Sequence, residues 1–468
     1  MLRIPDSPRP PLRFLPAAAR PWLLAIARPG SLLQTRMLGI RRVETTGGRH
    51  LVDMYRNLQE GRARFIIAFR HPSIDDGPMV FRLMCRIAGQ EAGRLGVRLA
   101  RAPKGYFLYG RDVPEWGGRY LAWVFPRLGA LSVFPGRLDS PSLSAIRRCL
   151  TDAPHPLAVA PEGQVTYHNE KVGALEPGTA QLAFWCTEDL RRQGREEEVF
   201  ILPVGFSYHY RETDWRGLAR LLAKIERECG LPALSAVPDP QPWVRVARIV
   251  RHLLDRAEDF YGRWYGVAFR KRGVGGTEAL QRRVDALVEA ALHVAEQYFR
   301  IAPRGGWLQR VLAVRHAGLT WIHREDIAST DAMPPLERAL AERVAAEAWL
   351  RLRHMELVDV LEYVRLDYLT PQSGIDRYVE SVTTLWDVVN RLEGGNISGR
   401  GTPFGRVARV QIAEPIAVSR FEPGYRANRR RGVAQLTDEI LRAFRAVAET
   451  GDGPDDGRGV AESAGGSA

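Results

Sequence analysis

A histidine and two adjacent aspartates follow the apolar run FIIAF in the stretch FRHPSIDDGP, from Phe69 to Pro78. His71 and Asp76 form the pattern H-x4-D, with the histidine at an expected strand end and the aspartate near a helix start marked by Gly77-Pro78. A turn of this length can fold the carboxylate back onto the imidazole, which holds the ring in one tautomer and raises its basicity. Such a pair can take a proton from a hydroxyl as that hydroxyl attacks an activated acyl group. General-base catalysis of this kind typically accelerates a reaction about 10²- to 10⁴-fold.

The same stretch also has a structural interpretation. Ser73 and Asp76 match a capping box, in which a serine and an acidic residue three positions later satisfy N–H groups at a helix start. In that interpretation His71 is a partly buried turn residue. Asp75 is either a second ligand for a bound group or a charge that favours the helix start, and we favour the second role. The spacing alone therefore does not separate a catalytic pair from a helix cap.

Further clusters of polar and turn-forming residues follow other apolar runs. The runs at 65–69, 130–134, 156–160 and 199–204 have the length and composition of strands, and helical stretches lie between them. In an open parallel sheet, ligands bind beyond the carboxyl ends of the strands. We therefore expect one crevice to collect His71, Asp75, Asp76, Arg137, Glu162 and Gly163.

The positions of these runs predict how the chain is organised. Residues 64–210 alternate short apolar runs with helical stretches, whereas 211–405 carry long helical patterns with few strand signals. A strand-like phrase returns within 406–450 and is followed by a closing helix. We therefore predict an α/β fold with a largely parallel central sheet flanked by helices and a large all-helical insertion before the last strand. Residues 1–63 are expected to form an N-terminal arm, and 451–468 a disordered tail.

Composition and charge limit the partners. With 468 residues, 45% of them hydrophobic, the chain is long enough to bury at least one large core. Its formal charge of +13 indicates an anionic partner such as nucleic acid, phospholipid headgroups or a phosphorylated substrate. No RNP-like motif supports RNA, so we predict no nucleic-acid partner. The four cysteines form no CxxC pair, which argues against a disulfide framework or a zinc knuckle and favours a reducing compartment.

The N-terminal arm has two interpretations. No segment is apolar enough to cross a bilayer, because arginine or proline interrupts every candidate well short of about 18 residues. The short apolar piece from Trp22 to Ile26 is bracketed by arginines and lacks the features of a signal peptide. A basic, amphipathic segment of this type can lie in a membrane interface, where each arginine near anionic lipid contributes roughly 1 kcal/mol. It can equally be a docking arm on the protein's own core.

Four phrases, in order, resemble the successive motifs of a known family. They are FRHPSIDD, LGALSVFPGR, VAPEGQ and ILPVG, and they resemble the motifs of the glycerophospholipid acyltransferases, which acylate glycerol 3-phosphate, lysophosphatidate and related lysolipids. The later phrase VARVQIAEPIAV resembles the strand that commonly follows that family's core. The resemblance covers roughly 64–210 and 406–449 and leaves the helical insertion unexplained.

The resemblance implies a role for particular residues. His71 corresponds to the catalytic histidine of the H-x4-D motif and Asp76 to its orienting partner. Neither a metal nor a tightly bound cofactor is implied. The implied substrate-binding residues are Arg137, which would contact the acceptor's phosphate, Glu162 and Gly163 of the third motif, and Pro203 of the fourth.

The third motif also departs from the family's usual pattern. Gln164 and Val165 follow Pro-Glu-Gly, where the family usually has a threonine or small residue and then an arginine. If that arginine normally holds phosphate, Arg70 or Lys171 could replace it here. Glu162 cannot attract a phosphate, so we expect it to orient a hydroxyl or an arginine, or to shape the turn with Gly163.

The sequence therefore predicts a glycerolipid acyltransferase that is cytoplasmic and peripherally associated with the inner face of the membrane. The expected donor is acyl-CoA or acyl-carrier protein, the acceptor glycerol 3-phosphate or a lysolipid, and the docking partner an anionic membrane surface. No G-x-S-x-G elbow is present, which argues against a serine esterase. One rival is a metal-dependent hydrolase or phosphatase with His71, Asp75 and Asp76 as ligands, helped by Glu162 or His168. The other is a non-enzymatic anionic-lipid- or RNA-binding protein with a decayed site.

Overall fold

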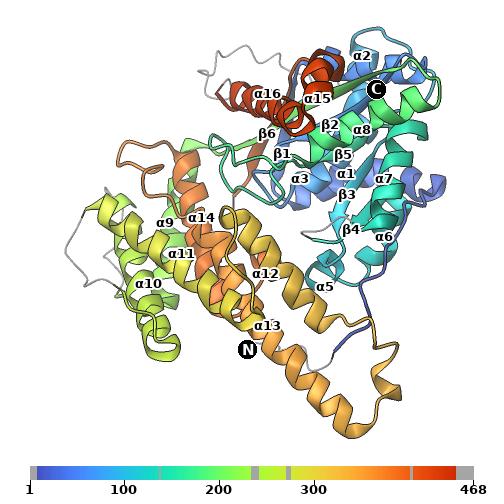
Figure 1. Ribbon diagram of the computed structural model, residues 1–468. Helices are drawn as coiled ribbons and strands as arrows, with labels where there is room; N and C mark the ends of the chain where they lie inside the picture. The colour runs from blue at the N-terminus through green and yellow to red at the C-terminus, as the bar shows by residue number, and fades with distance from the viewer. Residues whose placement is uncertain (1–7, 136–138, 233–241, 270–275, 401–403, 450–468) are drawn as a thin grey trace, which may run out of the picture.

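The computed structural model describes residues 8–135, 139–232, 242–269, 276–400 and 404–449, and it is built around one mostly parallel sheet (Figure 1). The strand order across the sheet is β1-β7-β6-β2-β5-β3-β4, and β8 pairs with β6. The strands are β1 (Ile40–Thr46), β2 (Ala63–Phe69), β3 (Tyr106–Gly110), β4 (Ala130–Val133), β5 (Leu157–Val159), β6 (Glu198–His209), β7 (Arg406–Ile412) and β8 (Ile416–Ala417).

Most neighbouring strands run parallel, as the sequence predicts. β2 is parallel to both β5 and β6, β3 is parallel to β4 and β5, and β1 is parallel to β7. β6 is antiparallel to β7 and β8, which return to the sheet after the helical region. The predicted α/β fold, with a largely parallel sheet and helices inserted before the last strands, is thereby confirmed.

Two strands are absent from the sequence-based expectation. β1 lies at one edge of the sheet and reads IRRVETT, so it lacks the apolar run that marks a buried strand. β3 lies between β5 and β4, and most of its side chains are only partly buried. As a result, residues 40–59, which the sequence groups with the N-terminal arm, form β1 and a helix of the core layer.

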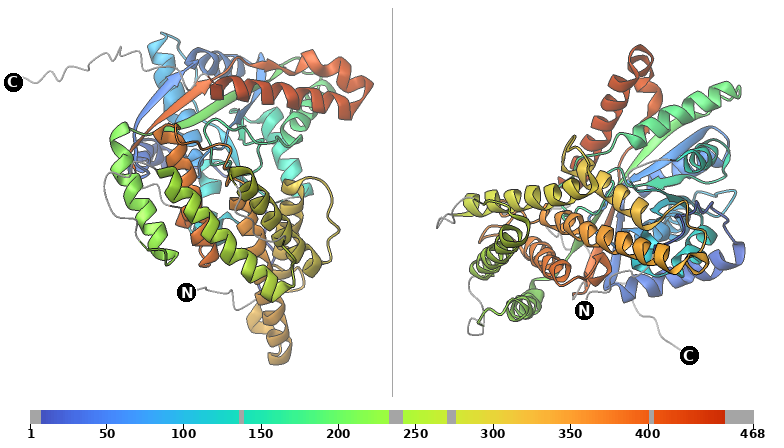
Figure 2. Two further views of the ribbon diagram at one scale, coloured as in Figure 1. Left: turned by 90° about the vertical axis from the view of Figure 1, so that its left-hand side faces the viewer. Right: turned by 60° about the horizontal axis from the view of Figure 1, so that its bottom comes forward.

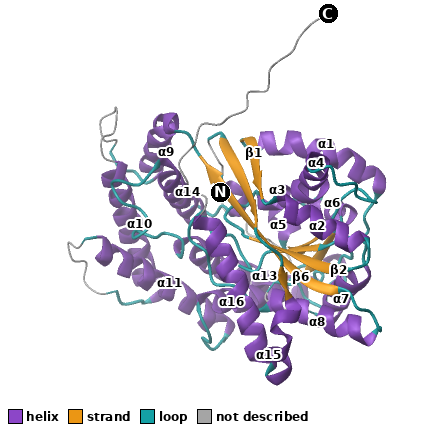
Figure 3. Ribbon diagram, turned by 90° about the horizontal axis from the view of Figure 1, so that it is seen from above, coloured by secondary structure: helices purple, strands orange, loops and turns teal. Residues whose placement is uncertain are grey.

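Helices cover both faces of the sheet because the side chains of β2 alternate between them. Ile66 and Ala68 pack into the core under α7, α8 and α16, whereas Ile67 and Phe69 pack into the core under α2, α3 and α4. Figure 3 shows these two helical layers on opposite sides of the strands. The bounds are α2 (Gly48–Gln59), α3 (Asp76–Arg82), α4 (Ala88–Arg94), α7 (Ser140–Asp152), α8 (Gly178–Arg192), α15 (Glu422–Ala427) and α16 (Arg429–Glu449).

The inserted helices form a body beside the sheet with a hydrophobic core of its own (Figure 2). The N-terminal half of α13 projects away from the neighbouring helices (Figures 1 and 2). The helices of this region are α9 (Trp215–Glu228), α10 (Pro242–Tyr265), α11 (Thr277–Phe299), α12 (Trp307–Ile322), α13 (Pro335–Leu361) and α14 (Ile375–Leu392).

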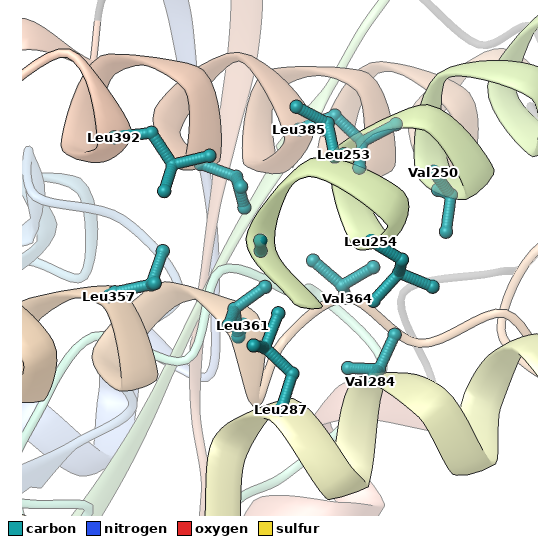
Figure 4. Close-up of a pocket in the computed structure, with 12 residues that line it drawn as sticks. Val250, Leu253, Leu254, Val284, Leu287, Leu357, Leu361, Val364, Leu385 and Leu392 are labelled. Carbon is teal, nitrogen blue, oxygen red and sulfur yellow. The ribbon is translucent and has the colours of Figure 1, made fainter. Parts of the chain in front are cut away.

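A small apolar cavity lies between α10, α11, α13 and α14 (Figure 4). Its volume is about 10 Å³, which is close to the space that one water molecule needs. The cavity is therefore a packing void and is too small to hold an acyl chain in this conformation. It is lined by Val250, Leu253, Leu254, Ala257, Val284, Leu287, Leu357, Leu361, Val364, Leu385, Val388 and Leu392.

Three helices complete the fold near the N-terminus and β4. They are α1 (Pro21–Met37), α5 (Val113–Gly117) and α6 (Leu121–Leu128). Within the described residues, every helix is too short or too polar to cross a lipid bilayer.

Candidate active site

The turn after β2 places His71 at the carboxyl end of the sheet. β2 ends at Phe69, and α3 begins at Asp76. α3 continues through a π-helical turn (Leu83–Ile87) into α4, so one uninterrupted helix anchors the end of the turn. The apolar side chains Val80, Leu83, Met84 and Ile87 of this helix are all buried.

His71 and Asp76 form a hydrogen-bonded pair. Nδ1 of His71 lies 2.9 Å from Oδ2 of Asp76, so the carboxylate holds the ring with its proton on Nδ1. Asp76 is completely buried, whereas the His71 side chain is 22% exposed. Nε2 of His71 has no hydrogen-bond partner among the described residues. The ring is thus oriented by a buried acid, is partly exposed and keeps one nitrogen without a partner among the described residues, which is the arrangement that a general base needs.

Two further donors fix the Asp76 carboxylate. The backbone N–H of Ser73 donates to Oδ2 at 2.8 Å, and the hydroxyl of Tyr208 donates to Oδ1. Tyr208 is itself buried near the end of β6. The predicted contact between Ser73 and Asp76 therefore exists, and the same carboxylate binds the histidine. Only the Ser73 N–H half of the predicted capping box forms, because the N-cap of α3 is Asp75 and no side chain caps the helix.

Glu162 holds the backbone of His71. Its Oε2 accepts a hydrogen bond of 2.6 Å from the backbone N–H of His71, and its Oε1 accepts one of 3.2 Å from Gly173. The side chain is buried and lies 3.8 Å from Nε of Arg70. Both oxygens are thus occupied by groups of the protein, so Glu162 fixes the position of the histidine main chain and of an arginine. This contact forms because β2 and β5 are parallel neighbours and both end at the same edge.

Arg70 organises the loop that follows β5. Its guanidinium donates to the backbone oxygens of His168 at 3.2 Å, of Lys171 at 2.8 Å and of Asn169. With 1% of its surface exposed, Arg70 is committed to this loop and is not available to a phosphate. The Lys171 ammonium pairs with Asp367 of the helical region at 3.2 Å.

The loop from 164 to 171 is also attached to the inserted helices. Gln164 donates to the hydroxyl of Tyr363 at 2.6 Å, and the backbone N–H of Asn169 donates to Glu380 at 3.1 Å. The Asn169 side chain meanwhile pairs with the backbone of Tyr208 through both its oxygen and its nitrogen. One loop therefore connects the sheet, the turn from His71 to Asp76 and the helical region.

Gly163 occupies a position that suits only glycine. Its φ is +70°, and a Cβ there would lie 2.9 Å from Oε1 of Glu176. Burial raises the pKa of the Glu176 carboxyl, which packs against this turn. Gly163 thus shapes the turn that presents Glu162 to His71.

Asp75 points away from the histidine. Its carboxylate pairs with Arg406 at the start of β7, and both side chains are buried. The Arg406 guanidinium also stacks over the Tyr208 ring at 4.3 Å. Asp75 therefore joins the turn from His71 to Asp76 to the returning strand instead of acting as a free ligand. Its position at the N-cap of α3 agrees with the helix-start role.

A polar cavity of about 40 Å³ adjoins the turn between His71 and Asp76. Arg400 and Arg406 both line it, and each has one buried guanidinium nitrogen without a hydrogen-bond partner, Nη1 and Nε respectively. The volume suits a few waters or one small anionic group. The other lining residues are Pro72, Ser73, Ile74, Tyr167, Asn169, Tyr208, Tyr210, Glu380 and Thr383.

The remaining predicted site residues lie in different places. Arg137 lies outside the described residues, as does the predicted tail at 451–468. Pro203 is buried within β6 and pairs in register with Ala68 of β2. The next residue, Val204, accepts a hydrogen bond at its backbone oxygen from the backbone N–H of Arg70. The structure therefore brings His71, Asp76, Glu162 and Gly163 together.

The sequence does not predict the contacts of three residues that complete the site. The aromatic segment Tyr208-His209-Tyr210 favours simple packing over an acyl groove, and the contact of Tyr208 with Asp76 depends on β6 continuing to His209. Arg406 opens the predicted returning strand, and Arg400 lies just after the last inserted helix. No local pattern pairs these arginines with a turn more than three hundred positions earlier.

The ligands that a metal-dependent hydrolase would need are dispersed. Asp75 pairs with Arg406. His168 lies between the sheet and the helical region, and its Nε2 is 3.1 Å from the backbone oxygen of Tyr363. Among the described residues, no three His, Cys, Asp or Glu side chains are placed to hold one ion.

The comparisons with known proteins add no assignment. No family model matches the chain, and no curated protein gives a significant match. The resemblance to the glycerophospholipid acyltransferases thus depends on the sequence motifs alone.

Proposed function

We propose that the protein is an acyltransferase that moves a fatty acyl group from a thioester donor to a hydroxyl of a glycerol-based acceptor. The donor is acyl-CoA or acyl-carrier protein, and the acceptor is glycerol 3-phosphate or a lysolipid. The observation that carries the proposal is the buried Asp76 carboxylate 2.9 Å from Nδ1 of a His71 ring whose other nitrogen is free.

The reaction needs one base and no enzyme nucleophile. Nε2 of His71 takes the proton of the acceptor hydroxyl while the hydroxyl oxygen attacks the thioester carbonyl. The tetrahedral intermediate then collapses, the carbon–sulfur bond breaks, and the imidazolium returns the proton to the thiolate. The products are an ester and a free thiol. Asp76 favours the charged ring in the transition state, and Glu162 keeps the histidine main chain in place.

The cavity beside the catalytic turn supports an anionic acceptor. Arg400 and Arg406 present cationic groups to it, and guanidinium is well suited to phosphate because its planar fork donates paired hydrogen bonds. We propose that the acceptor's phosphate binds there. The two arginines then take the place of the arginine that the third motif lacks at Val165. Ser73 lines the same cavity and donates its N–H to Asp76, so the two sites are adjacent.

The proposal is tested by incubating the purified chain with labelled acyl-CoA or acyl-carrier protein and a panel of glycerol 3-phosphate and lysolipids, with products identified by mass. We expect one new ester whose formation is abolished in His71→Ala, while thermal unfolding of that variant stays close to that of the wild type, because His71 is partly exposed. Full activity of His71→Ala would remove the mechanism.

The same experiment distinguishes the rivals. Release of free fatty acid or phosphate that a chelator blocks would favour the metal-dependent hydrolase. Binding to anionic lipid or RNA without any product, and with a steep dependence on salt, would favour the non-enzymatic protein.

We also propose peripheral association with the inner face of the membrane from the cytoplasm. The formal charge of +13 and the exposed apolar side chains of α1 support this location.

A further inference from the structure

The helix α1 has its apolar face turned outward. The buried residues on its inner side are Leu24, Ser31 and Thr35, two of which are polar. Four large apolar side chains are instead exposed on its outer side, with exposed fractions of 54% to 79%: Trp22, Ile26, Leu33 and Met37. At 100° per residue these four positions fall within about 60° of one another around the helix axis. This is the reverse of a helix that packs its apolar stripe against its own protein.

The start of α6 extends this apolar face. The rings of Trp22 and Trp123 lie 6.4 Å apart between centroids, and Trp123 is 48% exposed. Tyr120, which caps α6, is 66% exposed. Two separate segments of the chain thus contribute exposed aromatic rings to one surface. Tryptophan and tyrosine are the side chains that favour the headgroup level of a bilayer, because one part of each ring system is apolar and another part is polar.

The two sequence segments that carry this face are rich in arginine. Between positions 7 and 43 the sequence contains seven arginines and no aspartate or glutamate, and between 116 and 134 it contains two arginines and no acidic residue. Arg20 and Arg36, at the two ends of α1, are both exposed. These arginines form a basic rim, which attracts an anionic surface and repels the same rim on a second copy of the protein.

A second exposed apolar stripe, on α13, has a different character. On the projecting half of α13, Leu336 and Leu340 are 73% and 55% exposed, and Val344 continues the stripe. Acidic residues at 337, 342 and 347 are interleaved with this stripe. It therefore provides a matched comparison, with similar apolar exposure but without the basic rim.

We propose that Trp22, Ile26, Leu33, Met37, Tyr120 and Trp123 form a docking face that inserts into the headgroup region of an anionic phospholipid bilayer. The proposal deepens the membrane association included in the proposed function, but it does not need the acyl-transfer chemistry. α1 lies along the bilayer surface, with its apolar side chains among the upper acyl segments and its arginines at the phosphates.

The docking face is connected to the candidate active site through α3. The inner side of α1 packs on α3, where Leu24 contacts the cluster that contains Phe81 and Cys85. Nη1 of Arg82 donates to the Thr35 hydroxyl at 2.6 Å. Because α3 begins at Asp76, a single helix separates the bilayer-bound α1 from the His71–Asp76 pair.

The test is co-sedimentation of the full chain with vesicles of phosphatidylcholine alone or mixed with phosphatidylglycerol. We expect binding to the mixed vesicles that weakens as salt is raised. The double variant Ile26→Ser/Leu33→Ser should partition about tenfold less strongly or worse, because two aliphatic side chains no longer enter the lipid. The matched variant Leu336→Ser/Leu340→Ser should bind within about twofold of the wild type.

Three results would overturn the proposal. The first is wild-type protein that does not bind the mixed vesicles. The second is an equal loss of binding in both double variants, or no loss in Ile26→Ser/Leu33→Ser. The third is a wild-type dimer in analytical ultracentrifugation that this variant dissociates, which would make the face an interface between two copies. Acyl transfer to a water-soluble acceptor, measured in parallel without vesicles, tests the proposed function separately.

Discussion

The side chain of Glu162 and the backbone N–H of His71 are joined by a hydrogen bond of 2.6 Å, across two neighbouring parallel strands. The bond makes the turn after β5 the support of the histidine at the end of β2. The second oxygen of Glu162 accepts a hydrogen bond from the N–H of Gly173. In Glu162→Gln the side-chain NH₂ group would therefore face the N–H of either His71 or Gly173, and that hydrogen bond would be lost.

We therefore predict that Glu162→Gln lowers kcat about 10- to 100-fold while KM for the acceptor changes little, because a small shift of the histidine affects chemistry more than binding. Steady-state kinetics with both substrates varied would check this. Glu170→Gln is the control, because Glu170 lies on the same loop but pairs with Arg377 of the helical region. Wild-type kcat in Glu162→Gln would show that the hydrogen bond does not position His71.

Replacing the orienting acid should be more harmful. In Asp76→Asn the amide has the same shape as the carboxylate, but it carries no charge and no longer favours the protonated ring in the transition state. Its NH₂ group faces either Nδ1 of His71 or the Tyr208 hydroxyl. We expect kcat to fall about 10² to 10⁴-fold. Single-turnover acyl transfer, with circular dichroism to establish that the variant is folded, measures the effect. A rate within about threefold of the wild type would mean that Asp76 only caps α3.

The cavity lined by arginines predicts a selective effect on the acceptor. Arg400→Gln should raise KM for glycerol 3-phosphate about tenfold or more, since one charge-assisted hydrogen bond is lost, and should change KM for an uncharged monoacylglycerol little. Arg365→Gln is a suitable control, because Arg365 is partly exposed and pairs with Asp367. Equal effects on both acceptors would place the phosphate elsewhere, whereas wild-type protein that transfers no acyl group to either acceptor would contradict the proposed function.

A buried histidine in the helical region predicts a dependence of stability on pH. Burial, and next the charge of Arg351, lowers the pKa of His354 from 6.5 to about 4. Nδ1 of His354 lies 2.7 Å from the buried Tyr261 hydroxyl, and because its pKa is lowered the ring is neutral in the folded protein near pH 7. Between pH 6.5 and pH 4 the unfolded chain binds a proton that the folded chain does not, and the free energy of unfolding therefore falls as the pH is lowered.

The contribution is at most about 3 kcal/mol. His354→Gln keeps an acceptor for Tyr261 but does not titrate, so on acidification from pH 7 to pH 4.5 it should lose about 2 kcal/mol less stability than the wild type. Urea denaturation of both proteins at several pH values would measure this. Parallel stability curves for the two proteins would contradict the assignment.

The parts of the site that could be predicted are those that depend on neighbours in sequence or on parallel strands. His71 and Asp76 are joined by a single turn, and Glu162 follows a strand that pairs directly with β2. The contacts of Tyr208 and Arg406 depend on the length of β6 and on the register of an antiparallel strand that returns after the helical region. Nothing in the local sequence sets that register, so these contacts became apparent only in three dimensions.

The fold shows the same division. Strands with continuous apolar runs, such as β2 and β6, were located from composition because both of their faces are buried. β1 was not, because an edge strand with arginine and threonine side chains resembles a loop.

The loop after β5 has a consequence for any attempt to shorten the protein. Gln164, His168, Asn169 and Lys171 each bind a group of the inserted helices, while Arg70 and Tyr208 hold the same loop from the sheet. In the full chain Asn169 and His168 are buried. Replacing 211–405 with a short linker would expose both residues to water and remove their hydrogen-bond partners Glu380 and Tyr363. The inserted helices therefore form an integral wall of the candidate active site, and a chain cut down to the α/β part alone would lose contacts that hold the loop beside His71.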